Sequence, residues 1–174
     1  NYLFNADEQP EYITKDRSQK FSEPVHYNFV LRGGANTIGI IGSKSYPFLT
    51  LAAYADKRIN RKSTFQAGAE FFLSGAMEEF IYYQSVTFPN GKTTGDEDGK
   101  RLGIFLGHQL SFNKLSLITH LGYYAYYPYD NYVDRLYNRV GLQRVLYKDL
   151  FASVTVLAHG ANAEAVEFSL GYRL

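Results

Sequence analysis

The sequence has no cysteine, no tryptophan, a single methionine and no long hydrophobic run. Without cysteine, the chain has no disulfide scaffold, no thiol nucleophile and no cysteine-ligated metal. No stretch approaches the roughly 18 consecutive apolar residues of a membrane-spanning helix, and the mean hydropathy is -0.28. The net charge of +1 gives no basic face, so nucleic acid is excluded as a partner.

Aromatic residues and glycine are abundant instead, with 16 Tyr, 13 Phe and 15 Gly among 174 residues. This length fits one domain, and a chain that is 45% hydrophobic is too apolar for a disordered protein. Residues 1–24 are polar and show no sustained hydrophobic periodicity, so we expect an irregular N-terminal extension there. From residue 25 to residue 174 the pattern of apolar and polar residues becomes regular, and we expect this part to form the folded domain.

Residues 25–174 consist of segments of about ten residues in which apolar and non-apolar positions alternate. In residues 101–112, for example, Leu102, Ile104 and Leu106 share one face, whereas Arg101 and Gly103 lie on the other. The pattern predicts eight strands, at residues 25–42, 47–57, 64–84, 100–112, 114–127, 135–147, 150–159 and 163–174.

Two features favour a membrane barrel over a soluble sandwich. Short polar turns alternate along the chain with longer connections, as in outer-membrane barrels. Tyrosines also cluster near strand ends, where an interfacial girdle is expected: Tyr82, Tyr83, Tyr123, Tyr124, Tyr126, Tyr127, Tyr129 and Tyr132. We therefore predict an all-β fold, an eight-stranded antiparallel up-and-down outer-membrane β-barrel, with residues 1–24 on the periplasmic side.

An eight-stranded barrel is filled by its own side chains. We therefore expect the polar face to form an internal network rather than a pore, with Gln66, Glu70, Arg101, Arg139 and Gln143 as members. A soluble lipocalin-like barrel is the weaker alternative, because it requires an apolar interior.

The residues that point to chemistry lie at the junction of the last two predicted strands, in the segment HGANAEAVE. Together with GIFLGHQLSFNKLSLITHLGYYAYY and NRVGLQRVLYKDLF, this segment resembles the outer-membrane lipid A 3-O-deacylase (PagL-like) family and its acyloxyacyl hydrolase relatives. The resemblance covers about the last 75 residues. It implies a barrel that removes an ester-linked acyl chain from lipopolysaccharide.

The family's site is a His, a Ser two residues later, an Asn directly after the Ser and a Glu on the final strand. By this resemblance His159 is the base, Asn162 supports the oxyanion and Glu167 orients the His, with Glu164 as a competitor. Ala161 stands at the Ser position and has no nucleophilic group. A His159 and Glu167 pair that activates water directly is one interpretation, and a fold that persists without the chemistry is the other.

Other interpretations of these side chains stay open. Glu167 is as well explained by pairing with Arg139 or Arg173 inside the barrel. The four His form no close pair and no cofactor motif is present, so we expect neither a metal nor a cofactor. The expected location is the outer membrane of a Gram-negative bacterium, and the expected partners are lipopolysaccharide and other outer-membrane subunits. A catalytically inactive structural or accessory subunit is the alternative function.

Overall fold

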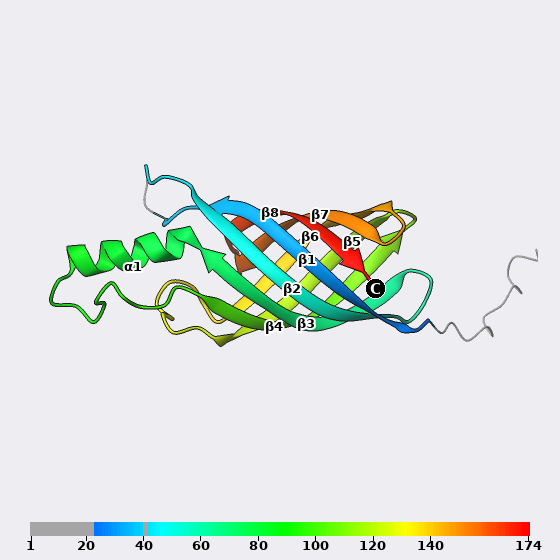
Figure 1. Cartoon of the computed structure of the whole chain (residues 1–174), viewed down its shortest axis with the longest axis horizontal. Coiled ribbons are helices and arrows are strands. Elements are labelled where there is room, and N and C mark those ends of the chain that lie inside the picture. Colours follow the sequence, from blue (N-terminus) through cyan, green and yellow to red (C-terminus); the bar gives the residue numbers. More distant parts are fainter. Residues whose placement is uncertain (1–22, 40–41) are drawn as a thin grey trace, which may run out of the picture.

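A computed structural model describes residues 23–39 and 42–174. Eight antiparallel strands, each paired with its neighbours in sequence, form a barrel that closes where β8 pairs with β1 (Figure 1). The strands are β1 (Val25–Asn36), β2 (Tyr46–Arg58), β3 (Ser63–Ser74), β4 (Arg101–Phe112), β5 (Leu115–Tyr126), β6 (Leu136–Tyr147), β7 (Leu150–His159) and β8 (Asn162–Arg173). The predicted eight-stranded up-and-down barrel is confirmed.

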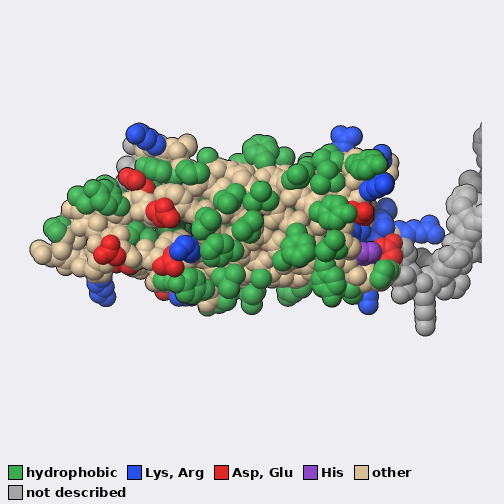
Figure 2. Space-filling view, in the orientation of Figure 1, with side chains coloured by type: hydrophobic (Ala, Val, Ile, Leu, Met, Phe, Trp, Pro, Cys, Tyr) green, Lys and Arg blue, Asp and Glu red, His purple; other side chains and the backbone are tan. Residues whose placement is uncertain are grey.

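The wall of the barrel has an apolar outer face and a largely polar inner face. Along β4, Ile104 and Leu106 are exposed on the outside, whereas Arg101 is fully buried inside. Hydrophobic side chains cover the visible flank of the barrel, and charged groups gather near its two ends (Figure 2). This is the reverse of a soluble protein and the arrangement of a barrel that faces lipid. The interior also holds buried charged side chains such as Arg101, Arg139 and Glu70 among its aromatic rings, unlike the apolar interior that a lipocalin-like barrel requires.

The strand predicted over residues 64–84 is wrong in its second half. β3 ends at Ser74, and a helix, α1 (Gly75–Thr87), follows directly. The Ser74 side chain accepts a hydrogen bond from the Met77 backbone N–H (3.3 Å) and so caps the helix. Ala, Met and two Glu in the first turns are strong helix formers. In the described part of the chain, no helix is both long and apolar enough to cross a bilayer.

The connections differ between the two ends of the barrel. The "turn end" carries the short turns at residues 59–62, 113–114 and 148–149. The "loop end" carries α1, the longer connections after β1 and β5, and the short turn at residues 160–161. There the predicted strand over residues 25–42 stops early, at Asn36. Residues 1–22 lie outside the described residues, so the extension expected at 1–24 and its location stay predictions.

The tyrosine girdle is only partly as expected. Tyr123 and Tyr126 are exposed on β5. Tyr124, Tyr127 and Tyr129 are buried instead, because alternation turns Tyr124 into the interior and the loop-end connection covers the other two. The inner tyrosines belong to an aromatic cluster that packs around buried charges.

Two arginines and two glutamates fill the middle of the barrel. Arg139 binds Glu70 through Nη1, at 2.6 and 2.7 Å from its two carboxylate oxygens, and Glu167 through Nε, at 2.6 Å. Arg32 adds a second cation on Glu70 at 3.1 Å. Two hydroxyls, those of Thr50 and Thr155, donate to Glu167 at 3.1 and 3.0 Å. The charges are balanced and hydrogen-bonded, as buried ions require.

A cysteine-labelling experiment tests the outward face. Single cysteines in place of Ile104, Leu142 or Leu170, which are exposed on the outer wall, are expected to react poorly with aqueous thiol reagents in membranes, because lipid covers them. A cysteine in place of Lys92, exposed in the connection between α1 and β4, serves as the accessible control and should react readily. Equal labelling of all four positions would contradict the membrane orientation of the wall.

Candidate functional site at the loop end of the barrel

His159, the last residue of β7, lies inside the barrel at the loop end. Its side chain is 5% exposed. The imidazole Nε2 lies 3.1 Å from the Tyr124 hydroxyl, and Nδ1 lies 3.6 Å from a carboxylate oxygen of Glu164. The Glu164 carboxylate, the His159 imidazole and the Tyr124 hydroxyl are therefore arranged in a row, as in a hydrolase triad. The hydroxyl, however, is a phenol with no exposed surface.

Glu164 is the centre of this group. Arg101 from β4 binds it in a bidentate arrangement, with Nη2–Oε1 at 2.6 Å and Nη1–Oε2 at 3.1 Å. The Asn36 amide also donates to Glu164, at 3.4 Å. The Arg101 guanidinium lies 4.8 Å from the Tyr124 ring centroid, inside a cage of aromatic rings. Because Arg101 balances the carboxylate, Glu164 has less negative charge to offer an imidazolium at His159.

Glu167 lies in a different layer of the barrel. It is opposite Thr155 in the β7–β8 ladder, four residues before His159. At about 3.3 Å of rise per residue, this separation is roughly 13 Å along the strand. Its carboxylate binds Arg139, the pairing that the sequence left open as an alternative, and so takes part in the central cluster. The structure thus brings His159 together with Glu164 rather than with Glu167.

Asn162 and Ala161 lie at the surface, unlike His159. The turn from His159 to Asn162 contains Gly160 in the left-handed region (φ 62°), and both Ala161 and Asn162 are exposed. A register shift between Leu157 and Ala158 interrupts the ladder just before this turn. His159 nevertheless stays on the inner face, as plain alternation predicts.

A polar cleft opens beside His159. It has a volume of about 450 Å³, and β8 and the connections after β1 and β5 supply most of its walls. Its lining includes Thr37, Asp130, Tyr132, Asp134, His159, Asn162 and Glu164. The cleft is large enough for water and a polar head group, and it is the place where His159 meets solvent. Within residues 23–39 and 42–174, no group of three or more His, Asp or Glu is arranged to hold a metal ion.

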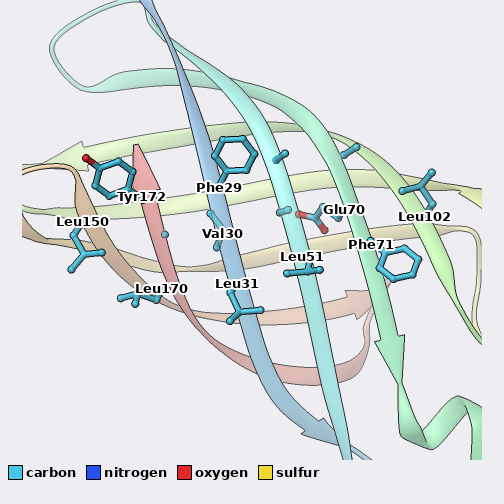
Figure 3. A pocket seen from close by; sticks show the side chains of 14 residues that line it. Phe29, Val30, Leu31, Leu51, Glu70, Phe71, Leu102, Leu150, Leu170 and Tyr172 are labelled. Atoms are coloured by element: carbon cyan, nitrogen blue, oxygen red, sulfur yellow. The ribbon is translucent and has the colours of Figure 1, made fainter. Parts of the chain in front are cut away.

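A second hollow lies on the outer wall, away from these groups (Figure 3). It has a volume of about 560 Å³, and large apolar side chains such as Phe29 and Phe71 surround the small Ala53 and Ala69. The nearby Glu70 carboxylate is bound to Arg139. This groove therefore offers apolar contact but no reactive group.

Sequence reasoning missed Tyr124 as a partner of His159. The only sequence signal for this contact is alternation, which places Tyr124 on the inner face of its strand together with His120. The contact depends on depth along the barrel, which the strand registers set: Tyr123 pairs with Leu136, and Asn138 pairs with Ala158. Those two registers bring the end of β5 to the level of His159.

Comparison with known proteins agrees with the fold. A family model described as "Acyloxyacyl hydrolase, C-terminal domain" matches residues 25–174. A search of curated proteins found no match. Among solved structures, a chain described under "De novo design of transmembrane beta-barrels" is similar, with a TM-score of 0.50 and 12% identity. The match covers 87% of this chain and 98% of that chain. At this identity the likeness concerns the fold alone.

The family match spans all eight strands and the whole loop-end site. The apolar outer wall, the polar filled interior and the similar membrane barrel agree with one another. The chain is therefore a transmembrane β-barrel that belongs to the acyloxyacyl hydrolase family.

Proposed function

We propose that this chain is a non-hydrolytic member of its family, a structural or accessory subunit in the outer membrane of a Gram-negative bacterium. One observation carries the proposal: position 161 is alanine, and the hydroxyl that reaches His159 belongs to the fully buried Tyr124. Ester cleavage by a covalent route needs a nucleophile that can approach the acyl carbonyl. A phenol with no exposed surface has no such access.

The surroundings of His159 point the same way. Its Nε2 is held by Tyr124, and Arg101 balances the charge of the neighbouring carboxylate. A general base must reach the proton that it removes, and a hydrolase triad needs a carboxylate to stabilise the imidazolium that forms. The contact of His159 with Tyr124 weakens the first requirement, and the contact of Glu164 with Arg101 weakens the second.

The alternation of short turns and longer connections supports an orientation with the loop end facing outward. In that orientation the apolar wall contacts lipid, and the cleft beside His159 lies at the level of lipopolysaccharide head groups. Lipopolysaccharide is accordingly the proposed neighbouring lipid of the barrel.

A second candidate, a lipid A deacylase-like esterase that activates water, is favoured by one specific observation. His159, Asn162 and Glu164 all line the same polar cleft, and His159 Nδ1 lies 3.6 Å from Glu164. In this mechanism His159 removes a proton from a water molecule in the cleft, and the resulting hydroxide attacks an acyl carbonyl. The ester C–O bond then breaks, and the protonated His159 returns the proton to the leaving alkoxide. The Asn162 amide is the group available to donate to the oxyanion.

Mass spectrometry of lipid A separates the two candidates. In cells that express the wild type, lipid A is expected to keep all its acyl chains. The same result is expected for Ala161→Ser, because the new hydroxyl sits in an exposed turn while His159 faces inward. Heat-modifiable migration in gels confirms that each variant is folded.

Two further variants make the water mechanism testable. If the wild type removes an acyl chain, His159→Ala should lower the rate by a factor of about 10² to 10⁴. His108→Ala is the matched control, since His108 lies near the turn end, where its ring packs against Phe65. Deacylation that is lost in the first variant and kept in the second would reject the non-hydrolytic proposal.

A further inference from the structure

Residues 75–100, which connect β3 to β4, form a projection that we name the α1 knob. Its helix begins at the loop end of the barrel and points away from the strands (Figure 1). Thirteen helical residues span about 20 Å at 1.5 Å per residue. The far end of α1 therefore lies well beyond the wall that contacts lipid.

The root of the knob is fixed to the barrel. Ala76, Met77 and Ile81 are buried, and the Phe80 ring packs against the rings of Tyr129 and Tyr132, at centroid distances of 6.3 and 5.2 Å. The helix thus has a preformed orientation, so a partner would not have to order it on binding.

The segment after the helix is also held in place. The Glu97 carboxylate accepts hydrogen bonds from the backbone N–H groups of Thr94 (2.7 Å) and Gly95 (2.9 Å). Asp98 accepts a hydrogen bond from the Tyr126 hydroxyl at 3.0 Å. The backbone hydrogen bond from Thr94 is the main reason why the pKa of Glu97 lies below its ordinary value. Glu97 is therefore ionised at neutral pH.

The far part of the knob carries large apolar side chains that the described residues, 23–39 and 42–174, leave exposed. Tyr82 and Val86 are each 62% exposed, Phe88 is 55% exposed and Tyr83 is 39% exposed. On the barrel wall such side chains face lipid, whereas these four belong to a segment that points away from the strands (Figure 1). Exposed large apolar side chains that gather away from the lipid-facing wall mark an interaction surface.

The net charge of the knob restricts what can cover this patch. The knob has five acidic residues and two lysines, a formal charge of −3. The phosphate groups of lipopolysaccharide would be repelled by this charge. A second copy bound face to face would place one negatively charged knob against the other, because a two-fold contact joins the same surface of both copies. Charge complementarity instead favours a basic protein surface.

We infer that the α1 knob docks a different protein, through a surface that is apolar at its centre and basic at its rim. Tyr82, Val86 and Phe88 supply the apolar contact, and the acidic residues set orientation and partner choice. The inference rests on the proposed function only for the outward orientation of the loop end, and it holds whether or not the barrel cleaves esters.

Site-specific photo-crosslinking in the native cells tests the inference. p-Benzoylphenylalanine placed at Val86 of the full chain should give, on irradiation, one adduct with a different protein, identified by mass spectrometry. That protein, purified, should bind the detergent-solubilised chain with an affinity that falls as salt is raised. The double variant Tyr82→Ser/Phe88→Ser should weaken this binding at least about tenfold, as loss of central interface aromatics does.

The same crosslinker at Ala161, another exposed loop-end position, is the matched control and should not give this adduct. An adduct of twice the chain's own mass, an adduct with lipopolysaccharide alone, the same adduct from Ala161, or no adduct would each overturn the inference. Labelling of Lys92→Cys in intact cells by a membrane-impermeant thiol reagent checks the orientation separately. A failure of the orientation is thus distinguished from a failure of the docking surface.

Discussion

Replacing Arg139 with methionine is expected to lower the free energy of unfolding by about 3–5 kcal/mol, the usual cost of removing one partner from a buried ion pair. Arg139 has no exposed surface and makes hydrogen bonds of 2.6 Å to both Glu70 and Glu167. Without it, Arg32 alone is left to balance two buried carboxylates. Urea unfolding in detergent micelles, followed by heat-modifiable gel migration, measures the change.

Arg144→Met is the matched control, because Arg144 lies on the same strand and is exposed. It should leave the unfolding midpoint close to that of the wild type. A triple variant that adds Glu70→Gln and Glu167→Gln to Arg139→Met removes the uncompensated negative charges. It should recover part of the lost stability. Similar unfolding curves for Arg139→Met and Arg144→Met would contradict the assigned role of the central cluster.

Leu142→Arg is expected to cost about 2–4 kcal/mol and to hinder assembly in the membrane. Leu142 is 51% exposed on the outer wall and lies near the middle of β6. A guanidinium at that depth loses its hydration, and its cross-strand neighbours on the outer wall, Leu117 and Val154, offer it no carboxylate. The yield of heat-modifiable barrel in isolated membranes, compared with total protein, measures the effect.

Gln143→Arg places the same charge one residue further along the strand, on the inner face. Gln143 lines a small polar cavity near the turn end that also contains Asp56 and Asp149. Its replacement should therefore reduce assembly far less than Leu142→Arg. A larger loss from Gln143→Arg would mean that the two faces of β6 have been assigned the wrong way round.

Most of the barrel could be predicted from local pattern alone. A period of two in hydrophobicity sets which side chains share a face, and six of the eight strands end within about two residues of the predicted positions. The internal charges also followed from pattern, because Glu70, Arg101 and Arg139 each occur at inner-face positions.

The helix was missed because its apolar side chains do not follow one stripe. Phe80, Ile81, Tyr82 and Tyr83 follow one another and are types that favour strands. The helix also has apolar residues on both its buried and its exposed sides. The serine cap and the two successive glutamates in the first turn were the available signals. They compete with the strand-favouring run Phe80–Tyr83, which follows β3 closely in the sequence.

The partner of His159 could not be predicted, because sequence proximity does not determine contact inside a barrel. Glu164 and Glu167 both lie near His159 in the sequence, and family resemblance favours Glu167. Contact depends on depth along the barrel, and depth depends on the register of each ladder. Glu167 opposes Thr155, which places it four residues deeper along β7, whereas Glu164 stays at the level of Arg101 and His159.

The central cluster has a consequence for the membrane that contains the barrel. Arg32, Glu70, Arg139 and Glu167, packed among aromatic rings, occupy the middle of the interior with balanced charge. A permeating ion would have to separate pairs that the low-dielectric interior holds strongly. We therefore expect the barrel to conduct no ions, so that many copies in one membrane would leave its permeability to salts unchanged.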